Sequence, residues 1–109
     1  MAAQSLSGKR VAILATDGVE QVELTEPRRA LDEAGATTQV VSPNDRAIKA
    51  WQHDHWGDEL DVDRTIDQAN ADEFDALLLP GGVMNPDHLR MDERAVNFVK
   101  AIANAGKPI

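Results

Sequence analysis

Short apolar runs along the chain alternate with longer segments in which apolar residues recur at helical spacing. Nearly continuous apolar runs occupy residues 10–15 (RVAILA) and 75–79 (DALLL), and residues 37–42 (TTQVVS) are rich in β-branched side chains. Runs of this length are typical of strands that helices cover on both faces. We therefore predict three buried strands, and the helical segments between them predict that neighbouring strands run parallel.

Two helices are predicted between and after these strands. Residues 22–33 place apolar side chains on one face and end at Gly35, a residue suited to a helix C-terminus. Pro27 lies inside this segment, so we expect a distorted first turn or a start delayed to the proline. Asp92 is suited to cap a second helix that ends before Gly106.

The segment between the second and third strands is predicted to leave the sheet. Residues 48–51 and 59–62 flank the polar sequence HDHWG at 53–57, and we interpret them as a small antiparallel pair. Residues 65–70 are expected to form a helical turn. The whole order predicts an open α/β sheet with helices on both faces, whose sites gather outside the carboxyl ends of the strands, in loops 16–26 and 81–90.

Composition narrows the class of protein. With 109 residues, 42% apolar and 28% charged, the chain suits one domain or part of one. No apolar leader or membrane-spanning run is present in the sequence, so a cytoplasmic location and no membrane partner are expected. A net charge of -8, with acids concentrated in residues 54–75, opposes nucleic-acid binding through a basic face. Cysteine is absent from these residues, which excludes a thiol nucleophile among them.

A dinucleotide or nucleotide site is disfavoured by the loop after the first strand. The sequence TDGVEQ at 16–21 has one glycine where the dinucleotide fingerprint needs three, and its carboxylates would repel a pyrophosphate. A phosphate-binding GKS or GKT is also missing. No cofactor is expected.

Several polar residues are candidates for chemistry. Glu20, Glu23 and Glu26 recur every three residues, and spacing alone favours solvated acids that offset the helix dipole. His53 and His55 would share one face of a strand, but without a third nitrogen or sulfur ligand we expect surface residues and no metal site.

Two tryptophans and two glycines are further candidates for a structural or a functional role. Trp51 and Trp56 are expected to serve packing or an interface. Gly81 and Gly82 follow a strand, where glycine usually means a tight turn, although its bare backbone can also aim an N–H at a developing oxyanion.

Taken in order, three segments give the chain a specific resemblance. The sequences RVAIL (10–14) and DGVEQVEL (17–24), then FDALLLPGG (74–82), with AGKPI (105–109) after one further helix, resemble the ThiJ/PfpI superfamily from residue 9 onward. The stretch WQHDHWGDELDVDR (51–64) is more similar to the bacterial general-stress branch than to the eukaryotic parkinsonism-associated branch. The resemblance implies a flavodoxin-like fold of the class I glutamine amidotransferase-like kind.

The resemblance also implies functional residues. Glu23 matches the family glutamate that hydrogen-bonds a cysteine at a nucleophile elbow, and Gly82, shaped by Gly81, matches an oxyanion-hole donor. Asp87 matches an acid that reaches the catalytic histidine from a neighbouring subunit, although the family residue is a longer glutamate. In the family the Cys-His pair follows the Gly-Lys-Pro sequence, so residues 1–109 are expected to be the N-terminal part of one domain that continues beyond Ile109, and to have no activity alone.

Two functions are therefore expected for the complete protein. The first is a homo-oligomeric, stress-response cysteine hydrolase that acts on peptides or on dicarbonyl-modified substrates. The second is a non-catalytic redox sensor or chaperone-like stress protein. For the first function we expect Glu23 to be buried and protonated, and to donate a hydrogen bond to the cysteine sulfur.

Overall fold

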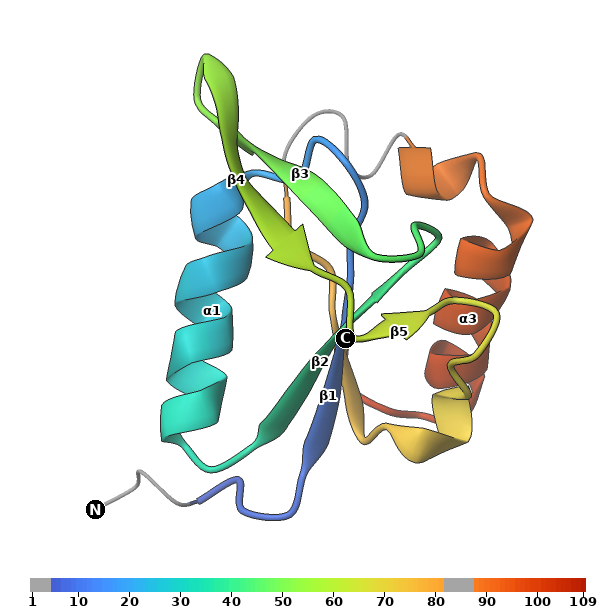
Figure 1. Cartoon of the computed structure of the whole chain (residues 1–109). Coiled ribbons are helices and arrows are strands. Elements are labelled where there is room, and N and C mark those ends of the chain that lie inside the picture. The colour runs from blue at the N-terminus through green and yellow to red at the C-terminus, as the bar shows by residue number, and fades with distance from the viewer. Residues whose placement is uncertain (1–4, 82–87) are drawn as a thin grey trace.

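A computed structural model describes residues 5–81 and 88–109 of the chain. Its main sheet has four parallel strands in the order β5-β2-β1-β6 (Figure 1). The strands are β1 (Arg10–Leu14), β2 (Thr37–Ser42), β5 (Arg64–Thr65) and β6 (Ala76–Leu78). Strand β1 pairs with both β2 and β6, so the three strands expected from the sequence are confirmed as parallel neighbours.

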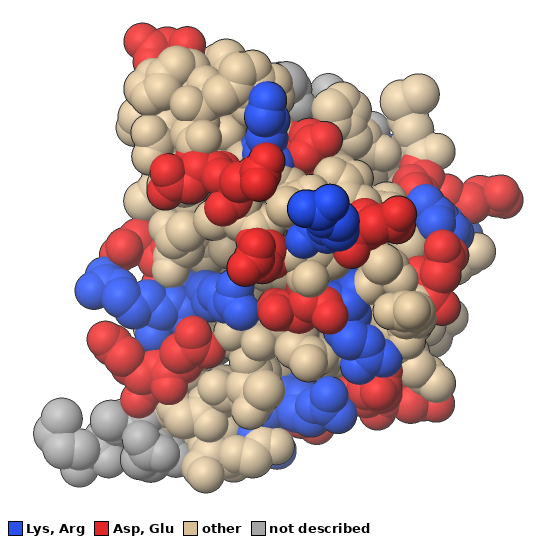
Figure 2. Space-filling model, in the orientation of Figure 1, with Lys and Arg blue, Asp and Glu red and all other residues tan. Residues whose placement is uncertain are grey.

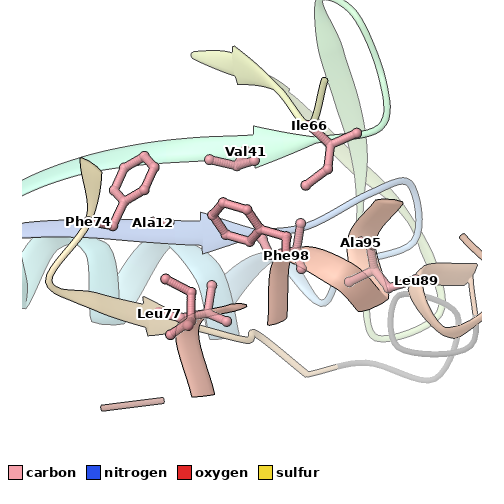
Figure 3. Close-up of a cluster of buried hydrophobic side chains, with 10 residues drawn as sticks. Ala12, Val41, Ile66, Phe74, Leu77, Leu89, Ala95 and Phe98 are labelled. Atoms are coloured by element: carbon pink, nitrogen blue, oxygen red, sulfur yellow. The ribbon is translucent and has the colours of Figure 1, made fainter. Parts of the chain in front are cut away.

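Successive side chains of these strands point to opposite faces, and both faces are buried. Ala12 and Leu14 of β1 belong to one apolar cluster, while Ile13 belongs to the other. Helix α3 (Glu93–Asn104) covers the first face, where Phe74 and Phe98 meet edge to face at 6.1 Å (Figure 3). Helix α1 (Gln21–Glu33) and the hairpin cover the second face. Helices on both faces of an open parallel sheet are what the sequence predicted.

Helix α1 corrects the expectation about Pro27. The helix begins at Gln21 and continues through the proline, which stands seven positions into it. Proline lacks an N–H, so the carbonyl of Glu23 loses the partner that an ordinary residue at position 27 would supply. The helix ends as expected, because Gly35 adopts φ 97° and the Gly35 and Ala36 amides donate to the carbonyls of Asp32 and Leu31.

The excursion between β2 and β6 is an antiparallel hairpin of β3 (Ala47–Gln52) and β4 (His55–Asp61). The sequence predicted the pair but placed residues 53–57 in its loop, whereas only His53 and Asp54 connect the strands. A turn follows β5, where the Thr65 carbonyl accepts from the Gln68 and Ala69 amides. The sequence did not reveal the two-residue strand β5 or the 3₁₀ helix η2 (Ala71–Glu73).

After α3 the chain returns to the open side of β6. The amide of Leu77 donates to the carbonyl of Pro108 at 3.0 Å. No helix in the described part of the chain has the length and apolar character needed to cross a membrane. Figure 2 shows acidic and basic side chains interleaved over the face in view, without a continuous basic patch there.

Candidate functional site

The candidate site lies where the sheet reverses its strand order. The chain leaves β1 toward β2 on one side and later returns to β6 on the other, and open α/β sheets bind ligands outside the carboxyl ends of such strands. The loops that follow β1 and β6 touch here, because the Glu20 amide donates to the Gly81 carbonyl at 3.2 Å. Two segments 61 positions apart in the sequence therefore meet at one point.

Glu23 projects from the first turn of α1 onto this contact. Its carboxylate lies so close to Gly81 that a methyl group at position 81 would overlap it. The structure thus brings together two of the residues that the resemblance had singled out. Gly82 and Asp87, the other two, lie outside the described residues.

The burial expected for Glu23 involves a segment after residue 109 and stays a prediction. Within the described part of the chain, the side chain of Glu23 is exposed, and its carboxylate lies against Gly81. An exposed carboxylate at the sheet's carboxyl edge leaves room for a further group to approach.

The three acids at helical spacing, Glu20, Glu23 and Glu26, make different contacts. Glu20 accepts a hydrogen bond at Oε2 from the His53 amide at 3.1 Å, which ties it to the hairpin. Glu26 pairs with Arg29 on the exposed side of α1. The Glu23 carboxylate lies against Gly81, whereas Glu20 meets Gly81 only through its main-chain amide, so the regular spacing does not mean a shared function.

The hairpin is anchored to the same corner of the molecule. The Trp51 amide donates to the Val19 carbonyl at 2.7 Å, and the Gly18 amide donates to the Lys49 carbonyl at 2.8 Å. Gln21 and Asp58 exchange two hydrogen bonds, of 3.0 and 2.8 Å. The first residues of α1 and the loop before it are therefore fastened to β3 and β4 (Figure 1).

The two histidines of the hairpin do not share a strand face. His53 occupies the turn with φ 56°, and His55 begins β4. His55 Nδ1 lies 2.7 Å from Asp54 Oδ1, and this hydrogen bond is the main reason why the pKa of Asp54 is below its usual range. Residues 5–81 and 88–109 contain no group of three or more histidine and acidic side chains arranged to hold a metal.

A polar cluster that sequence reasoning missed lies beside the site. Asp17 Oδ1 accepts from the Lys49 amide at 2.8 Å and from the Asn44 side chain at 3.2 Å. His88 Nδ1 lies 3.3 Å from the Asp17 carbonyl oxygen. Asp17 and Asn44 each follow a predicted strand, which was the available signal, but the contact with His88 spans 71 positions and has no local pattern.

An apolar hollow lies near the ends of β1 and β6. It has a volume of about 420 Å³ and lies between these strand ends and helix α3. Its lining is mostly aliphatic and includes Leu14, Leu79, Pro80, Leu89, Val96 and Val99. Leu79 remains 42% exposed there, so the open side of β6 presents apolar surface as well as an edge.

Comparisons with known proteins agree with this geometry. The chain is 41% identical over 103 residues to general stress protein 18 of Bacillus subtilis, covering 94% of this chain and 58% of that protein. It is 41% identical to the putative cysteine protease YraA of Bacillus subtilis and 39% identical to protein/nucleic acid deglycase 2 of Escherichia coli. Each of these two matches covers 93% of this chain and 57% of the relative. The chain therefore spans a little over half the length of these relatives.

Solved structures give the same result. A two-domain protein of Anabaena variabilis with DJ-1/ThiJ/PfpI-like and ferritin-like domains matches with a TM-score of 0.80 and 34% identity, over 91% of this chain and 28% of that one. Oxidised DJ-1 of Toxoplasma gondii matches with a TM-score of 0.79 over 92% of this chain and 53% of that one, and its 22% identity supports the fold alone. Residues 9–109 match the family described as DJ-1/PfpI. The chain belongs to the DJ-1/PfpI family, a flavodoxin-like α/β family that includes stress proteins.

Proposed function

We propose that the full-length protein is a stress-response cysteine hydrolase of the PfpI type, with a nucleophilic cysteine and an adjacent histidine located after residue 109. Its substrates are peptides or dicarbonyl-modified molecules. Relatives named as a putative cysteine protease and as deglycases support this substrate range. The observation that carries the proposal is the contact between the Glu23 carboxylate and Gly81 at the carboxyl ends of β1 and β6.

The position of β6 explains how a later segment would reach this contact. Pro108 already hydrogen-bonds to Leu77 on the open side of β6. A strand that continued from Ile109 along this edge would end beside Gly81, and a sharp strand-to-helix turn there would present a nucleophile to Glu23. The apolar hollow beside Leu79 would be covered by the same segment.

The residues present would then divide the chemistry. The protonated carboxyl group of Glu23 would donate a hydrogen bond to the cysteine sulfur and favour the thiolate, which is the reactive form. The N–H of Gly82, in a turn shaped by Gly81, would donate to the oxyanion of the tetrahedral intermediate. Asp87 would orient the catalytic histidine of a neighbouring subunit, so we propose a homo-oligomer. We also propose that this oligomer is cytoplasmic.

Thiol alkylation against pH tests the role of Glu23 in the full-length protein. Glu23→Leu removes a hydrogen bond to the thiolate, and we expect the alkylation midpoint to rise by about one pH unit. Glu23→Gln keeps a donor in the same place and should shift the midpoint less. Glu26→Gln, in the same helix, should leave it unchanged.

The same variants separate the hydrolase from its rival. A midpoint that is equal in the wild type and Glu23→Leu would contradict the role of Glu23. A shifted midpoint in Glu23→Leu, together with a wild-type protein that turns over neither methylglyoxal nor a peptide, would instead favour the redox sensor, which uses the same thiolate without hydrolysis.

A further inference from the structure

Glu20 stands at the N-terminus of α1 but does not cap it. N-cap side chains usually accept hydrogen bonds from the amides two or three residues on, and short side chains do this best. Glu20 has the extended backbone of an N-cap, with φ -66° and ψ 119°, yet its side chain makes no such bond. Its carboxylate instead accepts from the His53 amide, 33 positions away. The side chain of Glu20 therefore hydrogen-bonds to the hairpin tip, residues 52–55, and not to its own helix.

The hairpin tip adopts a conformation that needs such support. His53 has φ 56°, and the Asp54 amide donates to the Gln52 carbonyl at 2.5 Å, which together describe a γ-turn of the rare and strained kind. Strained backbone persists where its surroundings over-determine it, and it concentrates at functional sites. Here the His53 amide is held by Glu20, and the His53 carbonyl accepts from Trp51 Nε1 at 2.7 Å.

The main chain of Glu20 holds the candidate site at the same time. Its amide donates to the Gly81 carbonyl at 3.2 Å, beside the carboxylate of Glu23. One residue thus joins the strained tip to the turn after β6. Loss of the carboxylate alone would free the tip without removing the contact at Gly81.

We propose that Glu20 is a positioning residue that holds the hairpin tip as a wall of the site at Gly81. Glu20 contacts the tip through its carboxylate and the turn after β6 through its amide, so a tip held in this way would border the site. In this proposal Glu20 governs substrate affinity more than the chemical step. This inference rests on the proposed function, since substrate affinity is one of its readouts.

The tip also carries its own spectroscopic reporter. Trp51 and Trp56, the two tryptophans of residues 1–109, flank the turn with ring centroids 5.1 Å apart and planes at 88°. Indoles this close couple with each other, and the coupling appears as a couplet in the far-ultraviolet circular dichroism spectrum. Because Trp51 Nε1 donates a hydrogen bond to the His53 carbonyl, movement of the tip changes the couplet.

The experiment compares Glu20→Ala, Glu20→Gln and Glu26→Ala in the full-length protein, with Trp56→Phe to identify the couplet. Glu20→Ala should lose most of the couplet and raise KM for methylglyoxal about tenfold, with kcat within about twofold of the wild type. Glu20→Gln should retain both properties, because its amide oxygen still accepts from His53. Glu26→Ala is the matched control, since Glu26 pairs with Arg29 on the surface of the same helix.

Three results would overturn the proposal. An unchanged couplet in Glu20→Ala would show that the tip keeps its conformation without the Glu20 carboxylate. A lost couplet with an unchanged KM would show that the tip does not bound the site. Glu20→Gln behaving as Glu20→Ala would show that the hydrogen bond to His53 is not the cause. A wild-type protein without turnover would contradict the hydrolase, and the couplet would still decide whether Glu20 positions the tip.

Discussion

Gly81 illustrates a glycine that is required by its neighbour. It is not among the glycines with positive φ, so its backbone conformation is open to other residues. A side chain at this position would instead collide with the carboxylate of Glu23. The glycine keeps the Glu23 carboxylate at the end of β6, which is where the proposed chemistry needs it.

His53 offers the opposite case, a residue whose side chain makes its backbone conformation costly. A left-handed conformation costs an ordinary residue about 1 kcal/mol or more, a cost that glycine avoids. We expect His53→Gly to raise the free energy of unfolding by about 1 kcal/mol in urea denaturation of the full-length protein. The prediction concerns stability alone and does not depend on the proposed function.

His55→Gly is the matched control for this substitution. His55 lies in β4, where glycine weakens a strand by about 0.5–1 kcal/mol. The two substitutions should therefore change stability in opposite directions. A loss of stability in both would mean that the positive φ at His53 carries no strain.

Residue roles were only partly predictable from the sequence. Spacing grouped Glu23 with Glu20 and Glu26, and the family resemblance alone separated it from them. The link from Glu20 to His53 and the contact of His88 with Asp17 join residues 33 and 71 positions apart. No local pattern encodes such contacts, because they depend on how the loops meet in the folded chain.

At the scale of elements, the two long helices begin in different ways. The N-cap residue of α1 is Glu20, whose side chain makes no hydrogen bond to the helix. The N-cap residue of α3 is Asp92, whose carboxylate accepts from the Arg94 and Ala95 amides. Asp92 also pairs with Arg94 at 2.9 Å. These hydrogen bonds, first of all the one from the Arg94 side chain, hold the pKa of Asp92 below its usual range.

The cap of α3 therefore gives a prediction about acid. Because the pKa of Asp92 is depressed in the folded state, its stabilisation is complete above the unfolded pKa of about 3.9 and is lost as pH falls through the folded value. Asp92→Ala should lower the free energy of unfolding by about 1 kcal/mol at neutral pH. Urea denaturation at several pH values measures this difference.

Asp92→Asn separates capping from charge in the same experiment. Asparagine caps nearly as well as aspartate, so this variant should keep most of the stability at neutral pH. Its difference from the wild type should disappear in strong acid. A cost of Asp92→Ala that does not change with pH would contradict a role for the carboxylate charge.

Elements were predicted well where a pattern extends over several residues. The strands β1, β2 and β6 carry short apolar or β-branched runs, both helices carry apolar periodicity, and the glycines at 35 and 106 mark the two helix ends. Strand β5 has two residues and no periodicity, so it forms only because β2 offers an edge. The hairpin was found, but its loop was placed too wide because polar residues continue into the exposed strand β4.

At the scale of the whole molecule, the two faces of the sheet are covered and one side of β6 is not closed by a described strand. A single hydrogen bond between Leu77 and Pro108 begins to occupy that side, next to the apolar hollow. The chain spans a little over half the length of these relatives. The nucleophile that we propose after residue 109 is therefore still to be located.

A crystal structure of the full-length protein would show the position of the sulfur atom on which the proposed chemistry depends. We predict a cysteine after residue 109 whose sulfur lies within hydrogen-bond distance of the Glu23 carboxyl group, roughly 3.5 Å or less, at the carboxyl ends of β1 and β6. A strand that continues from Ile109 along β6 should lead to it. A full-length protein with no cysteine at that turn, or with its sulfur at the other end of the sheet from Glu23 and Gly81, would contradict the account.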